Sequence, residues 1–224
     1  MKKPANTSLI IVSAVLGIIL IVAFAVFVKS GKIGQETITL PIKFEEFADF
    51  ECPACGYYSQ YIDEVVKSYS SDNVVYQFRH FPLSSIHKYA YQASLATEAA
   101  REQGKFNEYS SLLFKLNIQE NLKTENTQVY LSDVQLIQYA QDLGLNVDKF
   151  KTDIKSDIVK ARVEADVNEA NSRGINGTPS FYISGRKFNL QQSAEIKTGD
   201  PEAVRNDVIR QFKAAIDERI KQAK

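Results

Sequence analysis

The pattern of apolar and polar positions first separates an N-terminal apolar run from the rest of the chain. Residues 9–28 are 20 consecutive positions without a charge. As a helix this run would span about 30 Å, the thickness of a bilayer core, and it is longer than the apolar core of a signal peptide, about 7–15 residues. We therefore expect an uncleaved transmembrane signal anchor at 9–28 and favour it over a cleaved signal. Residues 1–8 would form a cytoplasmic N-terminus and 29–37 a linker, although the flanking lysines favour that orientation only slightly.

From residue 38 onward the pattern predicts a strand, a helix and a second strand. Residues 38–50 are strand-like, and 74–78 is a short run rich in β-branched and aromatic residues. Between them, Pro53 is a favoured first helical residue, and apolar residues recur at helical spacing over 57–69, at Tyr58, Ile62, Val65 and Tyr69. This order predicts a compact βαβ unit.

The middle of the chain has helical patterns, and the end returns to strands. The predicted helices cover 89–103, 106–116, 132–144, 147–154 and 157–173, with a polar loop over 119–130 and a capping box at 132–135. A hairpin (180–183 and 187–190) and a last helix from Pro201 follow. The order indicates an α/β domain over 38–224, in which a helical insertion at about 88–156 interrupts a small mixed sheet.

Composition narrows the function classes. Lys plus Arg and Asp plus Glu both number 27, so the chain is formally neutral, and no basic cluster indicates nucleic acid as a partner. The chain has 13 Phe and 11 Tyr but no Trp, which predicts a Phe- and Tyr-rich core. Its only two cysteines cannot form a disulfide framework for a domain of this size, so we expect them to be reactive rather than structural.

These two cysteines, Cys52 and Cys55, lie three positions apart where the first strand leads into a helix. Disulfide exchange needs a thiolate, and the free N–H groups and positive dipole end at a helix start favour one. Cys52 lies at that point, and Cys55 follows one turn later. We therefore expect Cys52 to be the nucleophile and Cys55 to be the resolving cysteine, which attacks a mixed disulfide at Cys52.

Two other readings of the pair are a structural disulfide and a metal site. A bridge that closes so short a loop removes little entropy from the unfolded chain. Zinc needs four ligands, and the only imidazoles are His80 and His87. Their spacing, Cys-x2-Cys-x24-His-x6-His, lies outside the usual finger spacings of about 12–15 and 3–5 residues. Redox chemistry is therefore favoured, with no metal.

Glu46 is a candidate proton carrier. Strand alternation places it on the same face as Ile42 and Phe44. A carboxylate on that apolar face would be buried with a raised pKa and could shuttle a proton for Cys55. The alternative is an exposed carboxylate at a strand edge, like its neighbour Glu45.

Other residues carry weaker signals. The Thr178–Pro179 bond precedes a strand, and trans is its default because only about 5–6% of X–Pro bonds in folded proteins are cis. For His80 and His87 a core or turn role is favoured over stabilisation of a thiolate. Tyr57 and Tyr58 could border a substrate groove, but helix packing explains them equally well.

Three segments together resemble the DsbA-like branch of thioredoxin-fold disulfide oxidoreductases, in particular its membrane-anchored bacterial members. They occur in the order of that family, and the resemblance covers roughly 38–222. The segments are Phe47-x-Asp49-Phe50-x-Cys52-Pro53-x-Cys55, Arg79-His80-Phe81-Pro82-Leu83, and Gly174-Ile175-Asn176-Gly177-Thr178-Pro179-Ser180-Phe181.

The resemblance implies a thioredoxin-like fold with a helical insertion, preceded here by one N-terminal transmembrane helix. It implies that Pro179 is a cis-proline facing the cysteines, and that Thr178 offers its backbone to an extended substrate strand. Pro53 and Ala54 would contact substrate as well. It also implies that Glu46 occupies the family's buried acidic position, and that the domain lies outside the cytoplasm, at the cell surface or in the periplasm.

The chain departs from the family pattern at two places. Pro53-Ala54 stands where the best-known oxidase has Pro-His, and the absence of that histidine bears on the strength of oxidation. Asn107 stands where many relatives carry Trp, which implies local repacking.

The sequence therefore predicts a membrane-anchored thiol–disulfide oxidoreductase that donates its Cys52–Cys55 disulfide to extracytoplasmic proteins with cysteines. No cofactor beyond that disulfide is expected. The partners would be these substrates, the membrane and a membrane protein that reoxidises the pair, but no nucleic acid. The alternatives are a reductase or isomerase of the same fold and a non-catalytic binding or chaperone-like ectodomain.

Overall fold

The structure, a computed structural model, describes residues 38–121, 129–191 and 200–223. The described residues belong to one compact unit, Ile38–Lys224. The expected cytoplasmic N-terminus (1–8), signal anchor (9–28) and linker (29–37) lie outside them. Within the described ranges, none of the helices combines the length and the apolar character that crossing a membrane requires.

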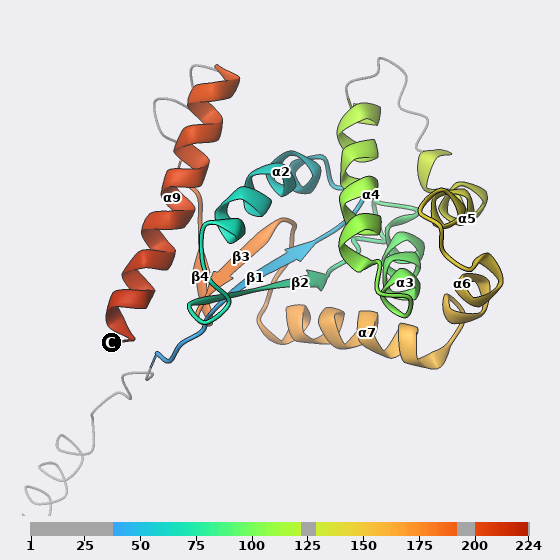
Figure 1. The fold of residues 1–224 in the computed structure, drawn as a ribbon, viewed down its shortest axis with the longest axis horizontal. Coiled ribbons are helices and arrows are strands. Elements are labelled where there is room, and N and C mark those ends of the chain that lie inside the picture. Colours follow the sequence, from blue (N-terminus) through green and yellow to red (C-terminus); the bar gives the residue numbers. More distant parts are fainter. Residues whose placement is uncertain (1–37, 122–128, 192–199, 224) are drawn as a thin grey trace, which may run out of the picture. The chain divides into compact units, whose positions relative to one another are not determined.

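Four strands form a mixed sheet in the order β2-β1-β3-β4 (Figure 1). Strand β1 pairs in parallel with β2 and antiparallel with β3, which pairs antiparallel with β4. The parallel pair needs a crossover connection, which α2 supplies. The predicted βαβ unit and terminal hairpin are thereby confirmed. The strands are β1 (Ile42–Ala48), β2 (Val74–His80), β3 (Ser180–Ile183) and β4 (Arg186–Phe188).

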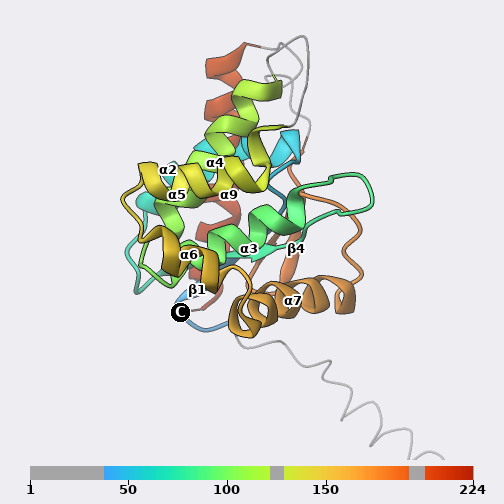
Figure 2. The ribbon, with the colours of Figure 1, turned by 90° about the vertical axis from the view of Figure 1, so that its right-hand side faces the viewer.

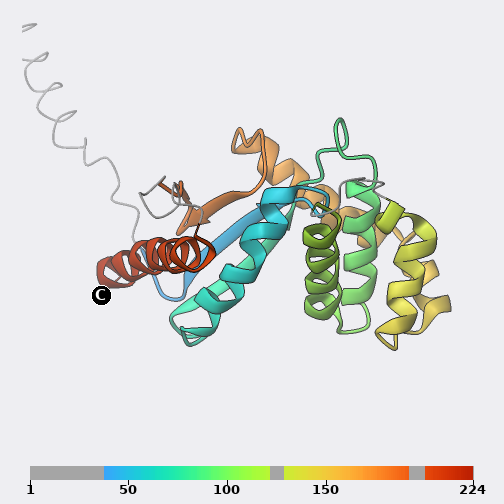
Figure 3. The same ribbon diagram turned by 90° about the horizontal axis from the view of Figure 1, so that it is seen from above.

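The helices that follow β2 within about residues 88–156 correspond to the predicted insertion. Figures 1 and 2 show α3, α4, α5 and α6 grouped beyond the end of the sheet at which β1 and β2 finish. Helix α2 contacts α9 and α4 and lies between them (Figure 3). The helical elements are α2 (Pro53–Lys67), α3 (Ala90–Arg101), α4 (Phe106–Asn121), η1, a 3-10 turn (Val129–Leu131), α5 (Asp133–Asp142), α6 (Val147–Asp153), α7 (Asp157–Ser172) and α9 (Pro201–Gln222).

Several predicted boundaries are wrong by a few residues. Residues 119–121, expected in a loop, belong to α4, where the Asn121 side chain donates to the Asn117 carbonyl at 2.8 Å. The Asn121 side chain therefore bonds back to the last turn of α4 and does not end the helix at residue 116. Ser132 precedes α5 as its N-cap, but its side chain makes no capping bond, so the capping box does not form. The start of helix α2 is confirmed, because the helix begins at Pro53 as predicted.

Both faces of β1 are covered. Phe44 packs on one face with Phe212 of α9, the ring centroids 5.3 Å apart, and Phe181 lies 4.9 Å from Phe212. Phe47 packs on the other face with Tyr182, at 5.8 Å. These contacts confirm the predicted Phe- and Tyr-rich core, because apolar burial of this kind is the main stabilising term in folding.

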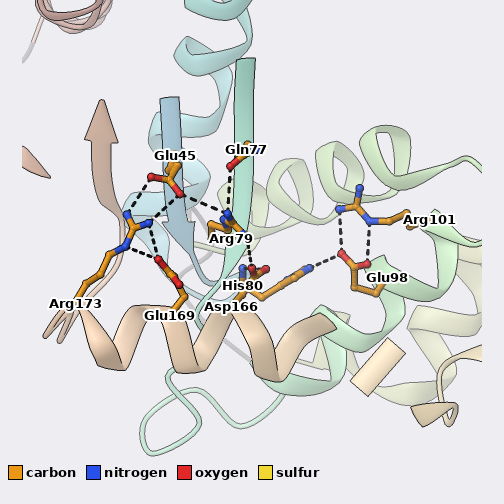
Figure 4. A network of polar contacts seen from close by, with 9 residues as sticks. All are labelled: Glu45, Gln77, Arg79, His80, Glu98, Arg101, Asp166, Glu169 and Arg173. Atoms are coloured by element: carbon orange, nitrogen blue, oxygen red, sulfur yellow. Dashed lines mark hydrogen bonds and ion pairs between the residues drawn. The ribbon is translucent and has the colours of Figure 1, made fainter. Parts of the chain in front are cut away.

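The same coverage buries Glu45, which the sequence placed at an exposed edge. Its residue exposure is 3%, because β1 is a central strand with α7 packed over this face. Arg173 donates to both Glu45 oxygens, at 3.0 and 3.2 Å, and also bonds Glu169 (Figure 4). Arg79 lies 3.5 Å from Glu45 and bonds Asp166 at 2.9 Å. The expectation of an exposed Glu45 is therefore wrong, and this carboxylate is satisfied by two guanidinium groups.

Replacement of Arg173 should expose the cost of this buried charge. We expect Arg173→Ala to lower the free energy of unfolding by about 2 kcal/mol, because Glu45 keeps only its longer contact with Arg79. Arg205→Ala, which removes an exposed pair with Glu64, should change it by less than about 0.5 kcal/mol. Urea unfolding followed by circular dichroism measures both, and equal effects of the two variants would contradict the interpretation.

Candidate active site

The two cysteines occupy the first turn of α2. Cys52 is the N-cap residue, with extended backbone angles, and Pro53 is the first helical residue. The Cys52 N–H donates to the Asp49 carbonyl at 3.1 Å, which closes the turn out of β1. Both residues are buried free thiols, with Cys52 6% exposed and Cys55 fully covered. The Cys52 sulfur therefore lies at the N-terminus of α2 with slight exposure to solvent, and the Cys55 sulfur is fully buried one turn later.

Their surroundings separate the two thiols. A hydrogen bond from the Cys55 thiol lowers the pKa of Cys52 to about 6, with further support from the backbone N–H groups of Ala54 and Cys55 and against opposition from burial. Burial raises the pKa of Cys55 well above its ordinary value, and the neighbouring Cys52 and Glu46 raise it further. At neutral pH, Cys52 is mainly a thiolate and Cys55 a thiol.

Glu46 lies on the buried face of β1, as its alternation with Ile42 and Phe44 predicts. It is 1% exposed, so the exposed-edge alternative is wrong. Tyr76 donates its hydroxyl to Glu46 Oε2 at 2.5 Å. Burial raises the pKa of Glu46 to about 8; the Tyr76 hydrogen bond counteracts this, and the charge of Cys52 adds to it. The carboxyl is therefore mainly protonated at pH 7.

The segment before β3 lies against Cys52. The Thr178–Pro179 peptide bond is cis, so the trans default is wrong at this position and the resemblance is right. When Cys52 is protonated, its thiol donates a hydrogen bond to the Thr178 carbonyl at 3.4 Å. Pro53 is exposed, while Ala54, Thr178 and Pro179 are half-buried. Of these four residues, Thr178 contacts the Cys52 sulfur through its carbonyl, and Pro53 and Ala54 directly follow Cys52 in the chain.

Asp49 is a residue of the site whose part the sequence did not reveal. Its buried carboxylate accepts the N–H groups of Glu51 and Leu83, both at 2.7 Å, and His87 Nδ1 lies 2.8 Å away. It therefore ties the turn that carries Cys52 to the segment after β2. The only signal was its place inside the cysteine motif, three residues before Cys52.

Asn117 of α4 is a second such residue. It is fully buried and donates to the Phe50 carbonyl at 3.0 Å. Its side-chain oxygen lies so close to Gly56 that a Cβ there would meet it at 2.2 Å. Glycine directly after Cys55 thus allows the inserted helix to hold the cysteine turn. Nothing in the local pattern of α4 pointed to this contact.

The two histidines have partners other than the cysteines. His80 is buried, with Nε2 2.9 Å from Glu98, which also bonds Arg101 (Figure 4). His87 bonds Asp49. The predicted core or turn roles are therefore confirmed, His80 in the core and His87 in the segment after β2. In the part of the chain that the structure describes, no group of three or more His, Cys, Asp or Glu side chains is arranged to hold a metal ion.

The separation of the thiols predicts a distinct alkylation profile. Because the pKa of Cys52 is lowered to about 6, its rate of reaction with iodoacetamide should rise with pH to a midpoint near that value. Cys55 should stay unmodified across the same range, since burial keeps it protonated. Mass spectrometry of tryptic peptides reads both sites. In Cys55→Ala the midpoint of Cys52 should rise, because the thiol that contributes most to lowering its pKa is gone. A midpoint near 8.5, that of an ordinary thiol, would contradict this electrostatic picture.

Comparisons with known proteins agree with this geometry. The family model described as thioredoxin matches residues 37–198. Among solved structures, BdbD from Bacillus subtilis (oxidised) superposes with a TM-score of 0.61 at 18% identity, over 84% of this chain and 90% of that one. The oxidoreductase DsbA from Xylella fastidiosa gives 0.60 at 17% identity, over 79% and 85%. At such identities the likeness shows the fold alone.

Curated relatives match over a similar part of the chain. The Na(+)/H(+) antiporter NhaA 3 of Salinispora tropica is 37% identical over 147 residues, which is 66% of this chain and 21% of the antiporter. NhaA 1 of Salinispora arenicola is 33% identical over 155 residues, 69% of this chain and 22% of that protein. The chain thus spans about a fifth of the length of these relatives. On the family match and the superposed folds, the chain belongs to the thioredoxin family and has a DsbA-like thioredoxin fold.

Proposed function

We propose that the chain is a thiol–disulfide oxidoreductase that donates its Cys52–Cys55 disulfide to substrate proteins. The observation that carries the proposal is the opposite environment of two adjacent thiols. Cys52 has a pKa lowered to about 6 at a helix start, and Cys55 is buried and protonated beneath it. A reactive thiolate next to a resolving thiol is what disulfide exchange requires.

In the oxidising direction a substrate thiolate attacks Cys52 Sγ of the disulfide. The Cys52–Cys55 bond breaks, a mixed disulfide forms, and Cys55 leaves as a thiolate that takes a proton from Glu46. A second substrate thiol loses its proton to solvent and attacks the substrate sulfur that is bonded to Cys52. The substrate disulfide forms, and Cys52 is released as a thiolate. Two electrons thus pass from the substrate dithiol to the cysteine pair. The low pKa of Cys52 makes it a good leaving group in the last step.

The surface around Cys52 suits an extended peptide. The half-buried Thr178, which precedes Pro179, contacts the sulfur through its carbonyl, and Pro53 and Ala54 directly follow Cys52 in the chain. A substrate strand that pairs with the backbone at Thr178 would bring its own cysteine to Cys52. This arrangement supports substrates that are unfolded or locally extended when they react.

For location we propose a membrane-anchored protein whose catalytic domain is extracytoplasmic, at the cell surface or in the periplasm, with a membrane partner that reoxidises the pair. The apolar run at 9–28 and the resemblance to membrane-anchored relatives support this. Ion transport is not part of the proposal, because the chain corresponds to only about a fifth of the antiporters that it matches.

A reductase is the second candidate, and one observation favours it. A pKa of about 6 for Cys52 lies between about 3.5, typical of a strong donor, and about 7, typical of a reducing thioredoxin. Ala54 contributes no imidazolium between the cysteines, so the thiolate has no added cation there. A non-catalytic ectodomain is disfavoured, because it has no use for a lowered pKa at Cys52.

Replacement of the resolving cysteine should trap substrates. Reduced Cys55→Ala is mixed with a model peptide whose two cysteines are joined in a disulfide. We expect its Cys52 thiolate to attack this disulfide, so that the mixed disulfide between Cys52 and the peptide accumulates. Cys52→Ser, the matched control, should accumulate none, because Cys55 is buried and protonated. Non-reducing electrophoresis with mass spectrometry detects the adducts. Adducts in Cys52→Ser but not in Cys55→Ala would reverse the two roles.

The direction of transfer follows from the reduction potential of the pair. We expect a value above about −200 mV in glutathione buffers, nearer to strong disulfide donors at about −120 mV than to thioredoxins at about −270 mV. Equilibration of the full-length chain with glutathione, acid quenching and mass spectrometry measure it. A value near −270 mV would make the reductase the better reading. A pair that does not equilibrate at all would indicate the binding ectodomain.

A further inference from the structure

Tyr76 holds the carboxyl that lies beside the cysteines. It belongs to β2, next to the strand that carries Glu46, and it pairs in register with Phe44, two residues before Glu46 on the same face. Its hydroxyl donates to Glu46 Oε2 at 2.5 Å. The other carboxyl oxygen, Oε1, has no hydrogen-bond partner among the described residues although it is buried. One oxygen is therefore fixed and the other is left for a proton.

The surroundings of this carboxyl connect it both to the cysteines and to solvent. Glu46 is close enough to Cys55 to raise the pKa of that thiol, and Cys52 is close enough to raise the pKa of Glu46. On its other side it lines a cavity of about 580 Å³ between α2, β2 and α4, which Tyr76 also lines. Tyr76 itself is only half-buried. The tyrosine thus stands where the buried carboxyl meets a space large and polar enough to admit water.

The titratable and charged groups that face Glu46 are few. Among the described residues they are Cys52 at the N-cap of α2, three residues within α2 (Cys55, Asp63 and Lys67), Tyr76 of β2 and Lys115 of α4. Asp63 and Lys67 are largely exposed and lie 3.8 Å apart, so they largely offset each other. Tyr76 is the only one of these groups with a hydrogen bond to the carboxyl.

We propose that Tyr76 is a positioning residue for disulfide exchange, whose hydroxyl orients the Glu46 carboxyl so that Oε1 exchanges a proton with Cys55. The proposal rests on the function proposed above. In the step where Cys55 resolves a mixed disulfide, its S–H proton passes to Oε1 and its sulfur bonds to Cys52 Sγ. The bond from Cys52 to the partner sulfur breaks, and the partner leaves as a thiolate.

The Tyr76 hydroxyl also sets the fraction of Glu46 that is deprotonated and can accept the proton of Cys55. Its hydrogen bond lowers the pKa of Glu46, which burial holds at about 8. Removal of the hydroxyl should raise that pKa by about one unit, typical of a lost bond to a charged group. At pH 7 this reduces the carboxylate fraction about tenfold, since one unit of pKa is a tenfold change in the fraction. The resolving step should slow by the same factor.

The test is the pH dependence of resolution in Tyr76→Phe. Full-length reduced protein is mixed with oxidised glutathione, quenched with acid and analysed by mass spectrometry, since the chain has no Trp for fluorescence. We expect the variant to convert the Cys52–glutathione adduct to the disulfide about tenfold more slowly at pH 7, with the midpoint of the rate moved up by about one pH unit. The alkylation midpoint of Cys52 should not move, because Glu46 is protonated near pH 6 in both proteins.

Two controls separate positioning from a structural role. Tyr69→Phe removes a tyrosine–carboxylate bond of 2.8 Å to Asp217. Tyr69 lies just beyond the C-terminal end of α2, whereas the cysteines are at its start, so this variant should leave the profile unchanged. In a Glu46→Gln background, Tyr76→Phe should have no further effect on the profile. Site-specific 3,5-difluorotyrosine at position 76 keeps the ring and strengthens the donor, so it should move the midpoint down.

The outcomes distinguish the two proposals. If the wild-type chain exchanges with glutathione but Tyr76→Phe keeps its midpoint, or slows the Glu46→Gln protein equally, Tyr76 has no positioning role and the proposed function stands. If the wild-type chain forms no disulfide, both proposals fail. Should Tyr76→Phe not fold, the fluorinated tyrosine decides the matter, because an unmoved midpoint in that protein overturns the role of Tyr76.

Discussion

The coverage of β1 on both faces is the constraint from which the rest of this structure follows. A central strand with helices over each face has no solvent for its polar side chains, so every carboxylate on it must find a partner or keep its proton. Glu45 takes the first solution, with Arg173 and Arg79 above one face. Glu46 takes the second, with Tyr76 as its donor on the other face and a raised pKa. Two adjacent, identical residues thus become a partner in an ion pair and a buried acid with a raised pKa.

The turn that follows β1 is held from three sides. Asp49 joins it to the segment after β2, Asn117 reaches it from the helical insertion, and Thr178 lies against Cys52 from the strand hairpin. These contacts come from positions distant in the sequence. They give the insertion a physical part in the site, because α4 buries the underside of the cysteine turn and bonds the Phe50 carbonyl. The turn is therefore preorganised for chemistry.

The positions of the two cysteines within one helical turn give their thiols opposite shifts in pKa. Cys52 at the helix start has N–H groups and a thiol donor near its sulfur, whereas Cys55 faces the interior and a neighbouring carboxyl. The same low-dielectric surroundings that raise the pKa of Cys55 raise that of Glu46. A buried acid whose pKa is near neutrality can give a proton to Cys55 in one direction of exchange and accept it in the other.

The sequence alone determined the element order and the cysteine turn at the start of a helix, because strand and helix periodicities and the N-cap position are local properties. Strand alternation also favoured a buried Glu46 but left an exposed edge position open. It placed helix ends within a few residues but ended α4 too early, since polar residues such as Asn121 bond within the helix. Only the tertiary structure decided that Glu45 is buried, that Asp49 and Asn117 hold the turn, and that Tyr76 contacts Glu46. Each of these depends on which distant segments pack together, and a local pattern carries no record of that.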